Sequence, residues 1–246
     1  MHKRTGVIIQ ARTSSTRLPG KVLKALPYGG SLTVVEQVIR RAKKAGGIDM
    51  VILATSTESS DDPLEVLAAK QDTPCFRGSL RDVLGRYRQA AEHYDLDVIV
   101  RVTADCPCLD PAVVERVLGE HLRTGADYTS NVLERTYPVG YGVEVVNRSL
   151  LETLDAEAQD PSHREHVTLY VRQRREGFKT VNVVAPEAMA APARRVTLDT
   201  WRDYILLCVV FDALYAQDPW FGVEAVTRLF QEKPWLEGIN AAEPVV

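Results

Sequence analysis

Short apolar runs alternate, in the first half of the chain, with segments whose apolar residues recur every three or four positions. The runs at 7–9, 50–54 and 98–102 are almost wholly apolar and predict buried parallel strands. The segments 33–45 and 82–94 carry apolar residues at helical spacing and predict amphipathic helices. Strands that alternate with helices imply right-handed crossovers, so we expect an α/β fold with a doubly wound sheet.

Acidic residues mark two further helix starts. Asp62 precedes Pro63 and is expected to cap a helix that runs to about residue 70. Pro111 follows Asp110 and predicts another helix in the same way.

The second half of the chain has a less regular pattern. Short strands are predicted at 127–131, 143–146, 178–184 and 195–200. Helices are predicted from Ser162 to about Arg175, with Ser162 as the cap, and from Trp201 and Val223. No repeat, low-complexity tract or linker interrupts the pattern, so we expect a single domain over residues 1–246.

Polar loops follow three of the predicted parallel strands, at the sheet edge where ligands bind in such folds. The loops span 10–21, 55–58 and 103–107, and the first reads QARTSSTRLPGK. In it, the cations Arg12 and Lys21 flank small hydroxyl side chains. The spacing of a P-loop is absent, but cations directly after a strand favour anion binding over a merely solvated basic loop.

Two acids, Asp105 and Asp199, stand at the ends of predicted strands. Either one alone could be a turn or capping residue, and Asp199 could cap the helix from Trp201. Together, beside a cationic loop, they indicate Mg²⁺ on a polyphosphate, because Mg²⁺ combines one or two carboxylates with phosphate oxygens and water.

Two other groups of residues are weaker candidates for a binding site. His163 and His166 share a helix face without a third ligand nearby, which favours a polar helix start or a substrate-binding edge over a zinc site. Tyr141 and Glu144 lie in and after the glycine-rich loop 138–142, where they could contact a sugar or simply pack.

Composition narrows the class of protein. The chain has 246 residues, 45% hydrophobic content and a net charge of −3, which is ordinary for a soluble globular protein and argues against non-specific nucleic-acid binding. Its four cysteines form no C-x-x-C pair and are interpreted as free thiols of a cytoplasmic protein. The longest apolar run, 205–211, is too short to span a membrane.

Five segments, in order over about residues 6–207, resemble the cytidylyltransferase family, above all its SpsF-like members and the acylneuraminate and KDO cytidylyltransferases. They are QARTSSTRLPGK, RVTADCPCLDP, SNVLERTYPVGYGVEV, SHREHVTLYV and RVTLDTWRDY. The resemblance implies a Rossmann-like, glycosyltransferase-A type three-layer fold with a mostly parallel sheet, and a homodimer. It also implies Mg²⁺-dependent transfer of CMP from CTP to an acidic or related sugar, with pyrophosphate released, in surface polysaccharide biosynthesis.

The resemblance also implies roles for individual residues. Arg12, Lys21 and Asp105 would be catalytic, with Arg12 and Lys21 on the CTP phosphates, and Asp105 and Asp199 would hold Mg²⁺. Further nucleotide contacts would come from Gln10, Ala11 and Ser14. Candidate sugar-binding residues are Arg101, Tyr141, Glu144, His163 and Arg164. Two alternatives stay open: a nucleotidyltransferase that uses another nucleoside triphosphate with a sugar phosphate, and a non-catalytic nucleotide-binding module.

Overall fold

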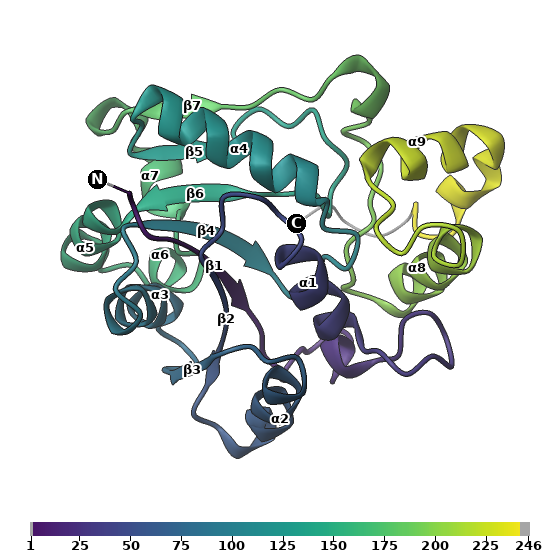
Figure 1. Cartoon of the computed structure of the whole chain (residues 1–246), viewed down its shortest axis with the longest axis horizontal. Coiled ribbons are helices and arrows are strands. Elements are labelled where there is room, and N and C mark those ends of the chain that lie inside the picture. The colour runs from purple at the N-terminus through teal and green to yellow at the C-terminus, as the bar shows by residue number, and fades with distance from the viewer. Residues whose placement is uncertain (1, 242–246) are drawn as a thin grey trace.

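The computed structural model describes residues 2–241, which build a seven-stranded sheet with the order β3-β2-β1-β4-β6-β5-β7 (Figure 1). The strands are β1 (Thr5–Gln10), β2 (Met50–Ser56), β3 (Cys75–Gly78), β4 (Val98–Thr103), β5 (Tyr128–Ser130), β6 (Glu144–Asn147) and β7 (Thr180–Asn182). Strand β6 runs antiparallel to both β4 and β5, and the other four pairings are parallel. The predicted α/β class with a mostly parallel sheet is confirmed.

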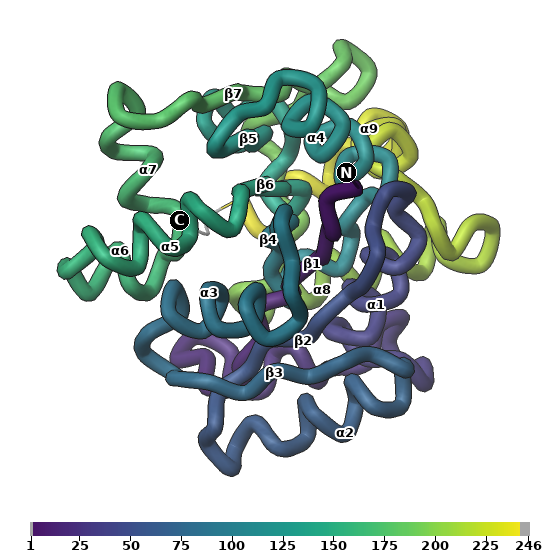
Figure 2. Tube along the Cα trace, turned by 60° about the vertical axis from the view of Figure 1, so that its left-hand side comes forward, coloured from purple at the N-terminus to yellow at the C-terminus, as the bar shows by residue number. Residues whose placement is uncertain are grey.

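Helices cover both faces of this sheet. They are α1 (Val34–Ala42), α2 (Asp62–Lys70), α3 (Val83–His93), α4 (Pro111–Thr124), α5 (Arg148–Glu157), α6 (Pro161–Glu165), α7 (Leu169–Gln173), α8 (Trp201–Leu214) and α9 (Val223–Glu232). Helices α1, α2, α4, α8 and α9 share one buried apolar cluster with the sheet, and α3, α5 and α7 share the other. Figure 2 shows α3 and α5 on one side of the central strands and α1 on the other.

The central strands are apolar throughout because both of their faces are covered. In β1, Val7 and Ile9 point into one cluster and Ile8 into the other, and all three side chains are fully buried. This is the reason for the continuous apolar runs that predicted β1, β2 and β4. No helix within residues 2–241 is both long enough and apolar enough to span a bilayer.

Three local predictions near the site are wrong. The helix predicted from Ser162 to Arg175 is two short helices, α6 and α7, separated at Val167, whose φ is +34°. The cap of α6 is Asp160, whose carboxylate accepts a hydrogen bond from the Ser162 N–H. Residues 195–200 do not form a strand: within residues 2–241, the β-pairing of this segment is limited to an isolated bridge between Arg195 and Val139.

The cap predicted for α2 is also wrong. Asp62 is the first residue of the helix and Asp61 precedes it, without a side-chain capping bond. The predictions missed β3 and α5. The single domain predicted for residues 1–246 includes Met1 and residues 242–246, which lie outside the described part of the chain.

Candidate active site

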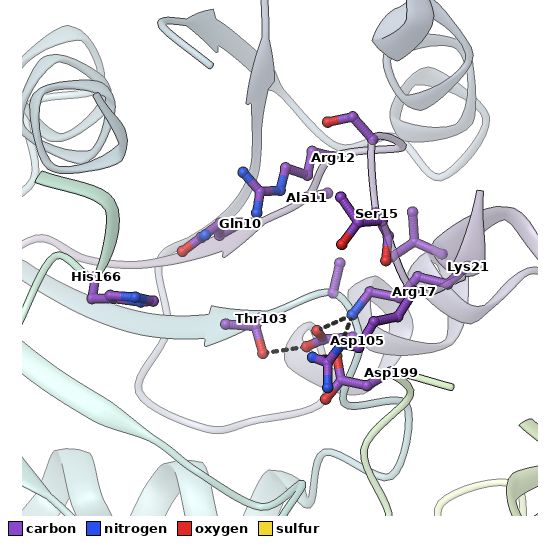
Figure 3. Close-up of a pocket in the computed structure, with 14 residues that line it drawn as sticks. Gln10, Ala11, Arg12, Ser15, Arg17, Lys21, Thr103, Asp105, His166 and Asp199 are labelled. Carbon is purple, nitrogen blue, oxygen red and sulfur yellow. Dashed lines mark hydrogen bonds and ion pairs between the residues drawn. The ribbon is translucent and has the colours of Figure 1, made fainter. Parts of the chain in front are cut away.

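A cavity of about 280 Å³ opens at the carboxyl ends of β1 and β4 (Figure 3). One wall is the loop after β1, from Gln10 to Lys21, and the other is the segment Thr103–Asp105 after β4. The two strands are parallel neighbours, with Gln10 opposite Thr103, so their following loops meet at one edge of the sheet. This is where open α/β sheets bind ligands.

Lys21 joins the two acids of the site. Its Nζ atom lies 2.7 Å from Oδ2 of Asp105 and 2.8 Å from Oδ1 of Asp199. Gly20, at φ +65°, precedes the short 3₁₀ helix Lys21–Leu23 and turns the chain so that the lysine faces the cavity. Three segments that are distant in sequence therefore converge on one ammonium group.

The charges of this group stabilise one another. Burial by itself would lower the pKa of Lys21, but Asp105 and Asp199 raise it above its ordinary value. Burial would raise the pKa of Asp105, but the Lys21 charge and hydrogen bonds from Lys21 and Thr103 hold it below its ordinary value. Lys21 is therefore an ammonium and Asp105 a carboxylate at neutral pH.

Asp199 has two further cationic partners. Arg17 Nη2 lies 3.0 Å from its Oδ1 and Arg195 Nη2 lies 2.5 Å from its Oδ2. Arg195 is in turn fixed by Asp203, whose Oδ1 accepts from its Nε at 3.0 Å. The cap of α8 is Thr200, which forms a capping box with Asp203. Asp199 therefore does not take the capping role that was open to it, and it lines the first cavity.

The cationic loop is anchored by a buried acid. Oδ1 of Asp61 accepts hydrogen bonds from the backbone N–H of Thr13 at 2.8 Å and from its hydroxyl at 2.7 Å. Its Oδ2 accepts from the Ser56 hydroxyl at 2.5 Å. Burial would raise the pKa of Asp61, but these hydrogen bonds from Ser56 and Thr13 lower it. No sequence pattern indicated this anchoring role of Asp61.

A second cavity of about 330 Å³ shares Gln10, Arg12, Asp105 and Asp199 with the first and extends beneath α6 and α7. At its base, Arg101 on β4 forms an ion pair with Glu144 on the neighbouring β6. Glu144 also accepts hydrogen bonds from Tyr128 and Thr168, and Arg101 donates to Gln10 at 3.2 Å. A network of buried polar groups thus links the start of the first loop to α7.

The backbone approaches itself closely beside this cavity. Gly140 has a φ of +111°, and a Cβ atom added there would lie 2.8 Å from the backbone carbon and oxygen of Val196. The Val139 N–H donates to the Arg194 carbonyl oxygen and the Val196 N–H donates to the Val139 carbonyl oxygen, both at 2.8 Å. Glycine therefore permits the contact that places the segment leading to Asp199.

The structure groups most of the predicted site residues. The first cavity is lined by Gln10, Ala11, Arg12, Ser14, Lys21, Asp105 and Asp199, and the second by Arg101 and Glu144. It also adds three residues to which the sequence had assigned no individual role in the site: Arg17, Thr103 and Arg195. His166, for which the sequence favoured a polar helix start or a substrate-binding edge, lines both cavities. Arg17 could have been recognised as a third cation of the first loop. No sequence pattern indicated that Arg195 would contact Asp199.

Three predicted sugar-binding residues lie away from both cavities. Tyr141 is fully buried in the apolar core. His163 packs edge-on against Tyr170 and contacts Gln173 Oε1 at 2.8 Å. Arg164 binds Asp82, the N-cap residue of α3, with Nε at 2.8 Å from Oδ1 and Nη2 at 2.6 Å from Oδ2. From the same segment, Glu165 and His166 line the second cavity.

The carboxylate oxygens of Asp105 and Asp199 are suitable ligands for Mg²⁺. Both acids already share one positive group, Lys21, and both offer hard carboxylate oxygens. Within residues 2–241, no three acidic, histidine or cysteine side chains cluster as a complete metal site. Two carboxylates fit an ion that completes its coordination with phosphate oxygens and water.

Comparisons with known proteins agree with this geometry. A sequence profile described as "Cytidylyltransferase" matches residues 6–237. The spore coat polysaccharide biosynthesis protein SpsF of Bacillus subtilis (strain 168) is 38% identical over 202 residues, 80% of this chain and 82% of that protein. The 3-deoxy-manno-octulosonate cytidylyltransferase of Myxococcus xanthus (strain DK1622) is 33% identical over 119 residues, 47% of this chain and 46% of that protein. A solved cytidylyltransferase from Leptospira borgpetersenii serovar Hardjo-bovis (strain JB197) has a TM-score of 0.90 and 31% identity, with both chains fully covered.

Proposed function

This chain belongs to the cytidylyltransferase family and is a nucleotidyltransferase, and we propose that it transfers CMP from CTP to an acidic or related sugar. The observation that carries the proposal is the contact of Lys21 with both Asp105 and Asp199 in the cavity at the carboxyl ends of the strands. A polyphosphate needs cations for its oxygens and acids for its metal ion, and this cavity offers both.

In the proposed reaction, a sugar hydroxyl attacks the α-phosphorus of CTP in line. The bond from that phosphorus to the β-phosphate oxygen breaks, and pyrophosphate leaves. Arg12, Arg17 and Lys21 balance the charge of the phosphates, since all three line the first cavity. The protein forms no covalent intermediate, so its contribution is positioning and electrostatic stabilisation.

Mg²⁺ is the proposed cofactor, with Asp105 and Asp199 as its protein ligands. When bound, the ion would stabilise the negative charge that develops on the transferred phosphoryl group. Thr103 supports this role, because its hydroxyl lies 2.6 Å from Oδ1 of Asp105 and orients the carboxylate. A role in surface polysaccharide biosynthesis is proposed from the similarity to SpsF. The single domain, the homodimer and the cytoplasmic location stay predictions.

The test is pyrophosphate release with Mg²⁺, each of the four nucleoside triphosphates, and a panel of sugar acids, sugar phosphates and neutral sugars. Release with CTP and a sugar acid supports the proposal and identifies the acceptor. Release with UTP or GTP instead of CTP supports nucleotidyl transfer but contradicts the proposed specificity for the cytosine base. CTP that binds without turnover across the panel contradicts the proposed reaction and favours a binding module.

A further inference from the structure

The second cavity contains more positive charge than its own acids compensate. Each acid that lines it already has a basic partner. The pairs are Asp105 with Lys21, Glu144 with Arg101, Glu165 with Arg12, and Asp199 with Lys21, Arg17 and Arg195. Every acid that lines this cavity is thus ion-paired with a basic side chain of the protein.

Two arginines of the same cavity are outside these pairs. Arg135 lies in the segment between β5 and β6, and Arg172 lies on α7. Across residues 2–241, neither side chain makes a hydrogen bond or an ion pair. Arg135 is partly buried, and its pKa is lowered first by burial and then by the charge of Arg172. Glu144 is the acid that attracts both arginines, but it is ion-paired with Arg101. Two guanidinium groups that have only this shared acid nearby leave a place for an anion.

This place differs from the candidate site for the triphosphate. Lys21, Ser14 and Ser15 line the first cavity alone, whereas Arg135 and Arg172 line the second and not the first. The two cavities meet at Arg12, Asp105 and Asp199. An acceptor in the second cavity would thus meet the nucleotide at the shared residues and could also contact the two arginines.

We propose that Arg135 and Arg172 bind an anionic group of the acceptor, a carboxylate or a phosphate, and so select charged acceptors over neutral ones. The proposal rests on the proposed function, because it assigns the recognition of the acceptor within the same reaction. Guanidinium groups suit both anions, since each can donate two parallel hydrogen bonds to a pair of oxygens.

The first experiment measures KM values for the acceptor and for CTP in Arg135→Gln and Arg172→Gln. Each variant is expected to raise the KM of a charged acceptor about tenfold or more, because it loses one charged hydrogen bond. The KM of CTP should stay within about twofold of the wild-type value. Arg172→Lys keeps the charge and should recover part of the loss. The matched control is Arg116→Gln, because Arg116 is exposed on α4 and lines neither cavity.

The panel distinguishes the two anions: a sugar acid and a sugar phosphate on the same ring are compared with the neutral sugar. A preference for either charged acceptor that disappears in the arginine variants supports the proposal. An acceptor KM that is unchanged in both variants, or a neutral sugar used as well as the charged ones, overturns it. Circular dichroism and thermal unfolding confirm that each variant is folded.

A binding measurement separates this proposal from the proposed reaction. Inorganic phosphate is titrated by calorimetry into wild type and into the double variant Arg135→Gln/Arg172→Gln, each saturated with CTP and without acceptor. A phosphate affinity about tenfold or more weaker in the double variant supports the arginine site even if no sugar is turned over. Equal affinities overturn the arginine site, whatever the pyrophosphate assay shows.

Discussion

The Nζ atom of Lys21 lies 2.7 Å from Oδ2 of Asp105, across 84 residues of sequence. The lysine belongs to the loop after β1 and the acid to the loop after β4, so the contact exists only because these two strands are neighbours. It brings a cation for phosphate and a ligand for metal to one point of the cavity.

Asp105→Asn is expected to lower kcat for pyrophosphate release by about 100-fold or more, because the amide cannot replace the charge of the carboxylate. Steady-state assays with CTP and Mg²⁺ measure the effect. The control is Asp212→Asn, which changes an exposed acid on α8 and should retain wild-type activity. Full turnover in Asp105→Asn would remove this acid from the mechanism.

Asp61→Ala is expected to destabilise the protein by about 3 kcal/mol, since the partly buried Thr13 and the buried Ser56 lose a charged acceptor. It should also raise the KM for CTP, because Asp61 holds the cationic loop in place. Urea unfolding and kinetics measure the two effects. Asp62→Ala is the matched neighbour: it removes an exposed ion pair to Arg77 and should cost about 1 kcal/mol or less. Equal losses in the two variants would contradict the anchoring role.

The stability of the protein should fall in acid, and Asp61 should contribute to the fall. Its pKa in the folded protein is below the ordinary value of 3.8. Its contribution is therefore complete above pH 3.8 and is lost as the pH decreases through the lower, folded pKa. Urea unfolding between about pH 2 and 6 should show a shallower acid dependence in Asp61→Asn than in wild type. If the free energy of unfolding depended on pH equally in Asp61→Asn and wild type, the Asp61 carboxylate would not contribute to the loss of stability in acid.

Gly140→Ala is expected to destabilise the protein by about 1–3 kcal/mol, because alanine at this φ is strained and its Cβ meets the Val196 backbone. Activity should fall as well, since the contact places the segment that leads to Asp199. The control is Gly119→Ala, in the exposed middle of α4, where an added Cβ has nothing within 4 Å. That variant should be neutral or stabilised by about 0.5–1 kcal/mol, because alanine favours the helix. Thermal unfolding distinguishes the two, and a tolerated Gly140→Ala would show that the segment can move aside.

The sequence by itself determined the central part of the fold and half of the site. Strands β1, β2 and β4 were predictable because burial on both faces requires an unbroken apolar run, which is a local pattern. The place of Lys21 and Asp105 followed from the same pattern, since loops after neighbouring parallel strands share an edge. Asp199 was indicated by its place at the end of a predicted strand and by the family resemblance, but neither indicated the arginines that hold it.

The tertiary structure decided the rest, because the deciding partners are distant in sequence. Arg164 follows a helical pattern like its neighbours, and only the packing of α6 on α3 directs it to Asp82 and away from the cavity. The turn at Val167 is invisible in the sequence, since a valine at positive φ follows no local preference. Arg135 and Arg172 are ordinary arginines in the sequence. Their role depends on which acids of the cavity are already paired, and that is a property of the folded chain alone.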